Sequence, residues 1–328
     1  MSKSINKKLL IILSCLTLML AVISIYLFTQ LKAVDNTSFI PISQYNPRTI
    51  MFNNANSRDT YFSIHNVSSA HDVSKGKGIK VGIMDTSYAY EKHRDIYAGG
   101  VNFCGKTDDR EEHGYWMTNV LKEIAPDCTV YALNIQSYNE DEKINNMIKA
   151  IDWAIENKID ILTYSGTEIS ENNRKQLDIA VNNAIKQGIV TTFINYDNPD
   201  NIYPSAMFPL AQRGKSRSPD LNIFSYDYNI LFTDLYINFT LQKEAAKSGN
   251  DVPFFSYSST SPVTAGFIAI LKSINNELTP KEYKDILIKT SYKMDYFDPN
   301  FNKKLVCTRV VDIGKAVDYL NKNYNEKQ

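Results

Sequence analysis

Neither sign of charge is in excess in this chain. The 36 Lys and Arg residues are matched by 36 Asp and Glu residues, so the formal net charge at pH 7 is zero. A protein dedicated to nucleic-acid binding normally carries a basic excess that neutralises phosphate groups. The balance therefore argues against that class, and we expect no nucleic-acid partner.

Cysteine, glycine and proline are also scarce. The 328 residues contain 4 Cys, 13 Gly and 11 Pro. Four cysteines are too few for a disulfide scaffold, and their spacing matches no zinc or redox CxxC pattern. A bridge between Cys104 and Cys128 is one alternative, but we expect free thiols. With 43% hydrophobic and 22% charged residues, the composition is that of a folded globular chain of one large domain or two ordinary ones.

One long apolar run stands near the N-terminus. Residues 9–31 carry no formal charge and are mostly Leu, Ile, Val, Met and Phe. At a rise of about 1.5 Å per residue they span roughly 30 Å, the thickness of a bilayer's hydrocarbon core. The run is longer than a signal-peptide core of about 7–15 residues, and it continues past Cys15, the residue that a lipoprotein would modify. We therefore expect an uncleaved transmembrane anchor.

The lysines around this run indicate its orientation. Lysines are more frequent before the run than directly after it. By the positive-inside rule, residues 1–8 are expected in the cytoplasm and the chain beyond the anchor outside it. Residues 32–70 contain Asn, Ser and Pro with little periodicity, which predicts a tether and a lead-in to the folded domain. The prediction is a single-pass cell-membrane protein.

Beyond Lys75, short apolar runs alternate with amphipathic stretches. This strand–helix–strand alternation predicts an α/β fold in which helices cover both faces of a mostly parallel sheet. Ligands of such sheets bind at the carboxyl ends of the strands, so residues that follow a strand are candidates for function. We expect strands at 79–84, 130–135, 159–164 and 189–194, and helices at 117–124, 142–157, 174–187 and 263–271.

Three residues of the types used in nucleophilic catalysis stand at the ends of predicted strands and helices. Asp85 directly follows the first strand, His113 precedes a helix, and Ser258 lies in a serine-rich segment before another helix. Each alone has a simpler interpretation, as a turn residue, a structural histidine or a helix cap. Together they follow the chain order Asp, His, Ser, which is one of the known orders of a serine triad.

Further segments resemble the subtilisin-like serine peptidase family. Asp85-Thr86-Ser87 is similar to the family's Asp-Thr-Gly, and His113-Gly114 is similar to the start of its His-Gly-Thr-His. Residues 258–266 align without a gap on Ser-Met-Ala-Thr-Pro-His-Val-Ala-Gly, with serine, proline, alanine and glycine in register. Other similar segments are 76–81, 93–96, 125–132, 165–166, 278–280 and 309–317.

The resemblance implies a three-layer subtilisin-like domain over residues 71–322, followed by a short tail at 323–328. It also implies a serine endopeptidase with a polypeptide substrate. Asp85 would orient the imidazole, His113 would act as base and then acid, and Ser258 would be the nucleophile. Ser165, Gly166 and the segment after Ile135 would pair with an extended substrate. Calcium sites are common in the family, but no carboxylate cluster here is assigned to one, and we identify no cofactor.

Departures from the family pattern concern the oxyanion hole. The gapless alignment of residues 188–197 places Asp197 where the family has an asparagine, and an ionised carboxylate would repel an oxyanion. A shift of one residue offers Asn198 instead, and Asn195 is a weaker option. Ser87 and Ser256-Tyr257 also replace glycine-containing motifs.

These departures favour an alternative function. The chain would then be a catalytically impaired subtilisin-like domain that binds a peptide or a partner protein. An esterase or lipase of another α/β fold is disfavoured, because Ser258 lies in no Gly-x-Ser-x-Gly elbow and the triad order differs. We regard the endopeptidase as the leading hypothesis, and the sequence predicts no oligomeric state.

Overall fold

A computed structural model of the protein describes residues 62, 64–105, 113–166, 170–194, 196, 198–202, 204–206, 220–223, 257–298 and 303–325. The predicted anchor at 9–31, the N-terminus at 1–8, most of the tether at 32–70 and the end of the tail lie outside these residues. Within the described ranges, no helix is both long and apolar enough to cross a membrane.

The chain divides into two compact units. One consists of Met1–Asn54 with Asp295–Val306, and the other of Ala55–Met294 with Cys307–Gln328. In the first unit, the described residues belong to two strands, β8 (Tyr292–Asp298) and β9 (Lys303–Val310). The predicted site residues all belong to the second unit.

A five-stranded sheet forms the centre of the second unit. Its strand order is β2-β3-β1-β4-β5, and the neighbouring strands are parallel. The central positions are buried apolar residues, which agrees with the apolar runs of the sequence. The strands are β1 (Lys80–Asp85), β2 (Gly99–Asn102), β3 (Thr129–Asn134), β4 (Ile161–Tyr164) and β5 (Val190–Phe193).

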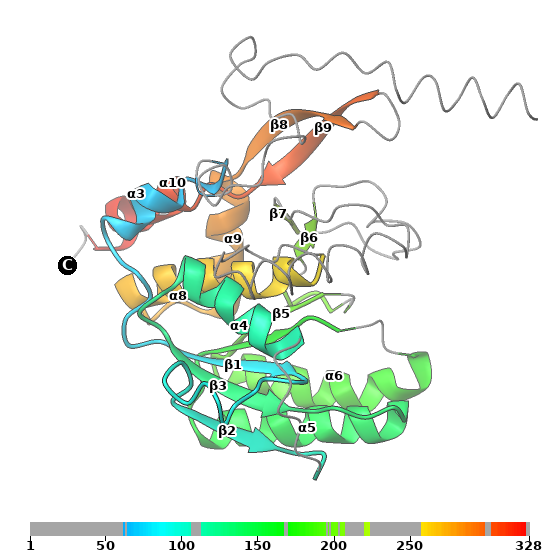
Figure 1. The fold of residues 1–328 in the computed structure, drawn as a ribbon. Coiled ribbons are helices and arrows are strands. Elements are labelled where there is room, and N and C mark those ends of the chain that lie inside the picture. Colours follow the sequence, from blue (N-terminus) through cyan, green and yellow to red (C-terminus); the bar gives the residue numbers. More distant parts are fainter. Residues whose placement is uncertain are drawn as a thin grey trace, which may run out of the picture. The chain divides into compact units, whose positions relative to one another are not determined.

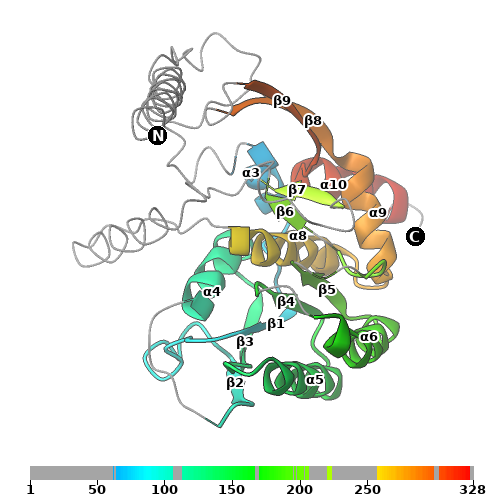
Figure 2. The ribbon, with the colours of Figure 1, turned by 90° about the vertical axis from the view of Figure 1, so that its right-hand side faces the viewer.

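Helices cover both faces of this sheet. Figures 1 and 2 show α4 (His113–Ile124) and α8 (Thr260–Ile274) on one side and α5 (Glu140–Glu156) and α6 (Glu171–Lys186) on the other. The apolar stripe of α5 is buried against the sheet, because its residues recur at helical spacing. The predicted three-layer α/β architecture is therefore confirmed.

Helix α8 is buried along nearly its whole length. Its residues from Thr260 to Lys272 are inaccessible to solvent or nearly so. A Cβ atom at Gly266 would lie 2.6 Å from side-chain atoms of Ile124, so a glycine is required for α8 to pack closely against α4. This contact fixes the position of the segment that carries Ser258.

Further elements pack beyond α8. The helices are α3 (Val67–His71), α9 (Pro280–Thr290), α10 (Ile313–Leu320) and a π-helical turn, η5 (Asn321–Asn325). Helix α9 begins with a capping box in which Thr279 and Glu282 bond each other's backbone N–H groups. A second sheet has the order β6-β7-β9-β8, with β6 at Pro204–Ala206 and β7 at Leu221–Ile223.

The two cysteines whose side chains are described form no disulfide. Cys128 is buried, Cys104 is partly exposed, and neither takes part in a disulfide. The alternative of a bridge between them is wrong. Burial raises the pKa of the Cys128 thiol to about 12, and the charge of Lys122 opposes this effect only in part, so this thiol is a core residue rather than a nucleophile.

Candidate active site

Asp85 is the last residue of the central strand β1. It pairs in register with Asn134 of β3, and its side chain is 8% exposed. One carboxylate oxygen accepts a hydrogen bond from the Thr86 N–H at 2.7 Å. The carboxylate therefore lies at the carboxyl end of the sheet, where the sequence predicts a site, and its orientation is fixed by the local backbone.

His113 is the first residue of α4, and the backbone of this helix is held against the loop after β1. The Gly114 N–H donates to the Thr86 carbonyl oxygen at 2.7 Å, and the Tyr115 N–H donates to that of Ser87 at 3.3 Å. A Cβ atom on Gly114 would lie only 2.4 Å from the Thr86 oxygen. The absence of a side chain at this position lets α4 approach closely enough to bring His113 to Asp85.

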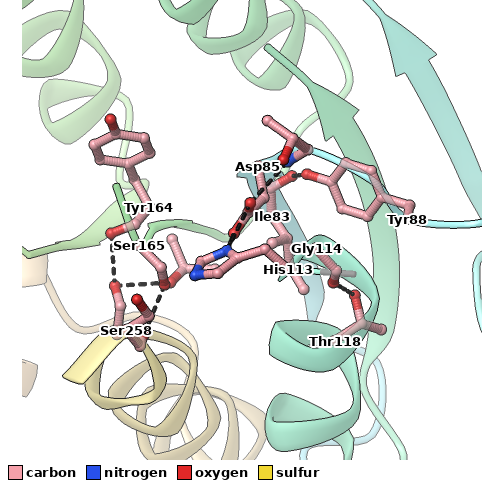
Figure 3. A network of polar contacts seen from close by, with 12 residues as sticks. Ile83, Asp85, Tyr88, His113, Gly114, Thr118, Tyr164, Ser165 and Ser258 are labelled. Atoms are coloured by element: carbon pink, nitrogen blue, oxygen red, sulfur yellow. Dashed lines mark hydrogen bonds and ion pairs between the residues drawn. The ribbon is translucent and has the colours of Figure 1, made fainter. Parts of the chain in front are cut away.

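The imidazole of His113 and the carboxylate of Asp85 are in direct contact. The Nδ1 atom lies 2.8 Å from each carboxylate oxygen, as Figure 3 shows. An Nδ1–H group that donates to this carboxylate leaves Nε2 as the free, basic nitrogen. The structure thus brings together two of the three predicted triad residues, which are 28 positions apart in the sequence.

Two opposing effects act on the pKa of His113. Burial lowers the pKa, and the charge of Asp85 together with its hydrogen bond raises it. The influence of Asp85 prevails, so the pKa of His113 lies above its ordinary value. This imidazole is therefore a stronger base than an ordinary histidine, which suits it for proton abstraction.

Ser258 lies in a 3-10 turn, η4 (Tyr257–Ser259), directly before α8. Its backbone carbonyl oxygen accepts a hydrogen bond from the Ser165 hydroxyl at 2.8 Å. Ser165 follows strand β4, so this bond ties the turn to the carboxyl end of the same sheet. The nucleophile candidate thus stands at a helix start, as the sequence predicts.

The buried hydroxyl of Ser261 fixes the first turn of α8. It accepts a hydrogen bond from Thr163 Oγ1 at 3.0 Å and contacts the carbonyl oxygens of Tyr164 and Thr192. Strands β4 and β5 are thereby joined to the helix that follows Ser258. Sequence reasoning missed this role, because a serine-rich segment before a helix looks like a cap, and only burial distinguishes the two.

The His113 ring lies between Asp85 and the segment of Ser258. Figure 3 shows the ring with one nitrogen directed at Asp85 and its opposite side facing Ser165 and Ser258, and α4 contacts η4. Among the described residues, the hydrogen bonds of the ring go to Asp85, and none joins it to the Ser258 hydroxyl. Catalytic hydrogen bonds are often long in the absence of substrate and shorten when it binds.

The loop after β1 contains a backbone conformation that is unusual for its residue. Ser87 has a φ of 58°, in the left-handed region that favours glycine. The sequence replaces the family's glycine with serine at this position. The chain therefore keeps the turn that follows the carboxylate, at the cost of local strain.

The predicted oxyanion residues are only partly described. The Asn198 amide nitrogen donates to Asn182 Oδ1 of α6 at 3.0 Å, and its oxygen accepts the Asp200 N–H at 2.9 Å. In this position the side chain of Asn198 closes the turn after β5. Asp197 and Asn195 lie outside the described residues, so the donor to an oxyanion stays a prediction. In the described part of the chain, no group of three or more His, Cys, Asp or Glu side chains could hold a metal ion.

Curated proteins similar in sequence are proteases. The chain is 29% identical over 128 residues to the minor extracellular protease Epr of Bacillus subtilis strain 168, covering 35% of this chain and 19% of that protein. It is 28% identical over 130 residues to subtilisin DY of Bacillus licheniformis, covering 35% of this chain and 46% of that protein. The alignments thus span less than half of each relative. No family model matches the chain.

Solved structures of proteases share the fold. A lanthipeptide protease superposes with a TM-score of 0.54 at 15% identity, covering 81% of this chain and 93% of that one. MycP1 without its N-terminal propeptide gives 0.53 at 12% identity, covering 78% and 96%. The comparisons support the subtilisin-like serine protease family. All of these relatives are named as proteases, and the solved structures, at 12% and 15% identity, show that the chain shares their fold.

Proposed function

We propose that this chain is a serine endopeptidase that hydrolyses peptide bonds through Asp85, His113 and Ser258. The observation that carries the proposal is the contact of 2.8 Å between His113 Nδ1 and the Asp85 carboxylate at the edge of the sheet that also holds Ser258. A buried carboxylate that fixes an imidazole beside a serine at a helix start is the arrangement needed for acyl transfer.

The reaction follows from these positions. The Ser258 oxygen attacks the substrate carbonyl carbon while His113 Nε2 takes the hydroxyl proton, and Asp85 stabilises the resulting imidazolium. The imidazolium then gives this proton to the leaving amine, which breaks the C–N bond and leaves an acyl-enzyme. A water molecule, deprotonated by His113, hydrolyses the ester and restores the Ser258 hydroxyl.

An extended polypeptide is the proposed substrate. Ser165 and Gly166 follow β4, and residues after Ile135 follow β3, so both segments leave the sheet at the edge where Asp85 stands. Backbone pairing with two such segments would hold a peptide across the triad with little dependence on its side chains. Because such pairing needs a peptide backbone on both sides of the scissile bond, it supports a polypeptide cleaved within its chain as the substrate, and not a small ester.

Labelling with a fluorophosphonate tests the activated nucleophile. We expect the native chain to be labelled and Ser258→Ala to remain unlabelled. The matched control is Ser68→Ala, which changes an exposed serine of α3 and should be labelled like the native chain. Labelling that persists in Ser258→Ala would exclude Ser258 as the nucleophile.

Two observations favour the alternative, a silent domain that binds a peptide or a partner. The His113 ring makes no hydrogen bond to Ser258 in the part of the chain described, and the sequence has Asp197 at the oxyanion position. Absence of labelling in a folded native sample, with retained binding of a peptide, would establish this alternative.

We further propose that the domain is anchored in the cell membrane and faces outward. The support is the uncharged run at 9–31 and the lysines that precede it. Protease treatment of intact cells should then remove the C-terminal domain, while a cytoplasmic marker protein stays intact. Resistance of the domain in intact cells, with digestion after lysis, would contradict the outward orientation.

A further inference from the structure

The ammonium group of Lys284, on helix α9, lies among three oxygen atoms. Its Nζ atom is 2.8 Å from the Pro199 carbonyl oxygen, 3.3 Å from that of Asn201 and 3.0 Å from Asp220 Oδ2. The side chains of Lys284 and Asp220 are each only 12% exposed. The charged group is therefore largely removed from water and surrounded by protein oxygens.

These oxygens come from segments that are distant in the sequence. Pro199 and Asn201 lie in the turn after β5, and Asp220 directly precedes β7. Lys284 thus joins α9 to the turn after β5 and to the segment before β7. The same turn carries Asn198, one of the predicted oxyanion residues.

The turn after β5 is fixed from its inner side by Asn201. This side chain is fully buried, accepts a hydrogen bond from the Phe193 N–H at 3.0 Å and donates to the carbonyl oxygens of Phe193 and Tyr196 at 3.0 and 3.2 Å. With its inner side closed in this way, the turn directs the carbonyl oxygens of Pro199 and Asn201 at Lys284. The oxygen site is therefore preorganised.

Two carbonyl oxygens and a carboxylate are the donors that hard metal cations such as Ca²⁺ prefer. An ammonium group offers three N–H donors and one positive charge, which match three acceptor oxygens and one carboxylate. We propose that Lys284 takes the place of a bound metal ion at this oxygen site. The stability of this region is then independent of metals, and removal of the lysine side chain opens a calcium site. This inference does not depend on the proposed peptidase activity.

Lys281 on the same helix provides a matched control. Its ammonium group pairs with Asp285, but the two side chains are 74% and 55% exposed. An exposed pair four residues apart on a helix contributes little to stability and encloses no site. Lys281→Ala therefore removes a lysine from α9 without opening an oxygen site.

The experiment measures thermal unfolding of the purified full-length chain with EDTA and with about 10 mM CaCl₂. With EDTA, we expect Lys284→Ala to lower the Tm by about 10 °C, because it leaves a buried carboxylate without its charged partner. Calcium should restore about 5 °C, as expected for a weak site at this concentration. For the native chain, the Tm with calcium should equal the Tm with EDTA, and the same should hold for Lys281→Ala.

A second variant separates occupation of the site from removal of charge. Lys284→Met fills the space with an apolar side chain, so it should be destabilised like Lys284→Ala but should not respond to calcium. Lys284→Ala is produced both with and without calcium, so that the yield of folded protein is a second measure of calcium binding. Failure of calcium to raise the Tm or the folded yield of Lys284→Ala, or an equal response of the native chain, would overturn the proposal.

Discussion

Two histidines in different regions of the molecule have opposite acid–base character. His113 lies at the carboxyl edge of the central sheet, where its Nδ1 atom is 2.8 Å from the Asp85 carboxylate and its pKa is raised. His65 lies beside α10, where its Nδ1 atom is 2.8 Å from the Val311 carbonyl oxygen and its ring contacts Phe267. Burial lowers the pKa of His65 to about 4, and the Val311 hydrogen bond and the charge of Asp312 only partly oppose this effect.

The difference shows what a buried imidazole needs in order to act as a base. Both Nδ1 atoms lie 2.8 Å from an oxygen, which is a carboxylate oxygen of Asp85 for His113 and the backbone carbonyl oxygen of Val311 for His65. A neutral carbonyl does not compensate for the lost hydration of an imidazolium, whereas a carboxylate does. His65 is therefore a neutral structural residue at physiological pH, and His113 is suited to take up a proton.

The largest effect is expected from the variant that removes the carboxylate charge beside His113, since this charge distinguishes the surroundings of His113 from those of His65. Asp85→Asn should lower kcat about 10⁴-fold on a peptide substrate, because the amide neither fixes the productive tautomer nor stabilises the imidazolium. The pH at which activity is half-maximal should also fall, because the charge that raises the pKa of His113 is gone.

The matched control for this variant is Asp312→Asn, beside the other histidine. An asparagine can still cap α10, as Asp312 does through the Lys315 N–H, so activity and its pH profile should stay native. An equal loss of activity in both variants would remove the distinction between the two carboxylates.

Acid should destabilise the protein through His65. The pKa of His65 is 6.5 when unperturbed and about 4 in the folded state, so its contribution to stability is present above pH 6.5 and is lost as the pH falls toward 4. The loss is about 3 kcal/mol, because the unfolded chain takes up a proton that the folded chain does not. His65→Gln should remove this part of the pH dependence in urea unfolding at pH 7 and pH 4.

The control for this prediction is His93→Gln, which changes a partly exposed ring that stacks on Tyr115 at 4.3 Å. Because His65 is intact there, the acid-induced loss of stability should persist. If the free energy of unfolding of His65→Gln fell between pH 7 and pH 4 as much as that of the native chain, the acid sensitivity would come from other groups.

The approach of α4 to the loop after β1 is tested by Gly114→Ala. The added Cβ atom would lie 2.4 Å from the Thr86 oxygen, so α4 must shift and carry His113 away from Asp85. We expect kcat to fall about 100-fold, the usual effect of a displacement near 1 Å. The control is Asn119→Ala, on the exposed face of α4, which should leave kcat unchanged. If Gly114→Ala also left kcat unchanged, the close approach of α4 would not be needed for activity.

The smallest expected effect concerns Ser87, the strained residue that follows Asp85 in the loop after β1. Ser87 has a φ of 58°, which glycine adopts without strain. Ser87→Ala and Ser87→Gly both remove the hydroxyl, and only the glycine variant also removes the strain. Ser87→Gly should therefore be more stable than Ser87→Ala by about 1 kcal/mol in urea unfolding. Equal stability of the two variants would indicate that the turn is not strained.

Much of the central sheet could be predicted from the sequence. Strands β1, β3, β4 and β5 lie within two residues of the predicted ranges, because each is a short apolar run that is buried on both faces. Strand β2, with the sequence Gly-Gly-Val-Asn and an alternating half-exposed pattern, contains no such run and was missed. Helix α8 begins at Thr260 rather than at residue 263, because its first turn consists of hydroxyl residues that are buried by tertiary contacts.

The candidate site was only partly predictable. Asp85, His113 and Ser258 were identified from their order and from a family resemblance, but spacing alone says nothing about the distance between Asp85 and His113. The need for a glycine at position 114 follows from one close contact with a backbone oxygen. The role of Lys284 depends on carbonyl oxygens, which every residue has and which therefore leave no signal in a sequence.

An NMR titration of the histidine rings tests the central claim most directly. In the native chain, the resonances of His113, assigned by comparison with His113→Gln, should titrate above the ordinary histidine pKa, and Asp85→Asn should move this titration to lower pH. A His113 ring that titrates at or below the ordinary value, unaffected by Asp85→Asn, would contradict the account.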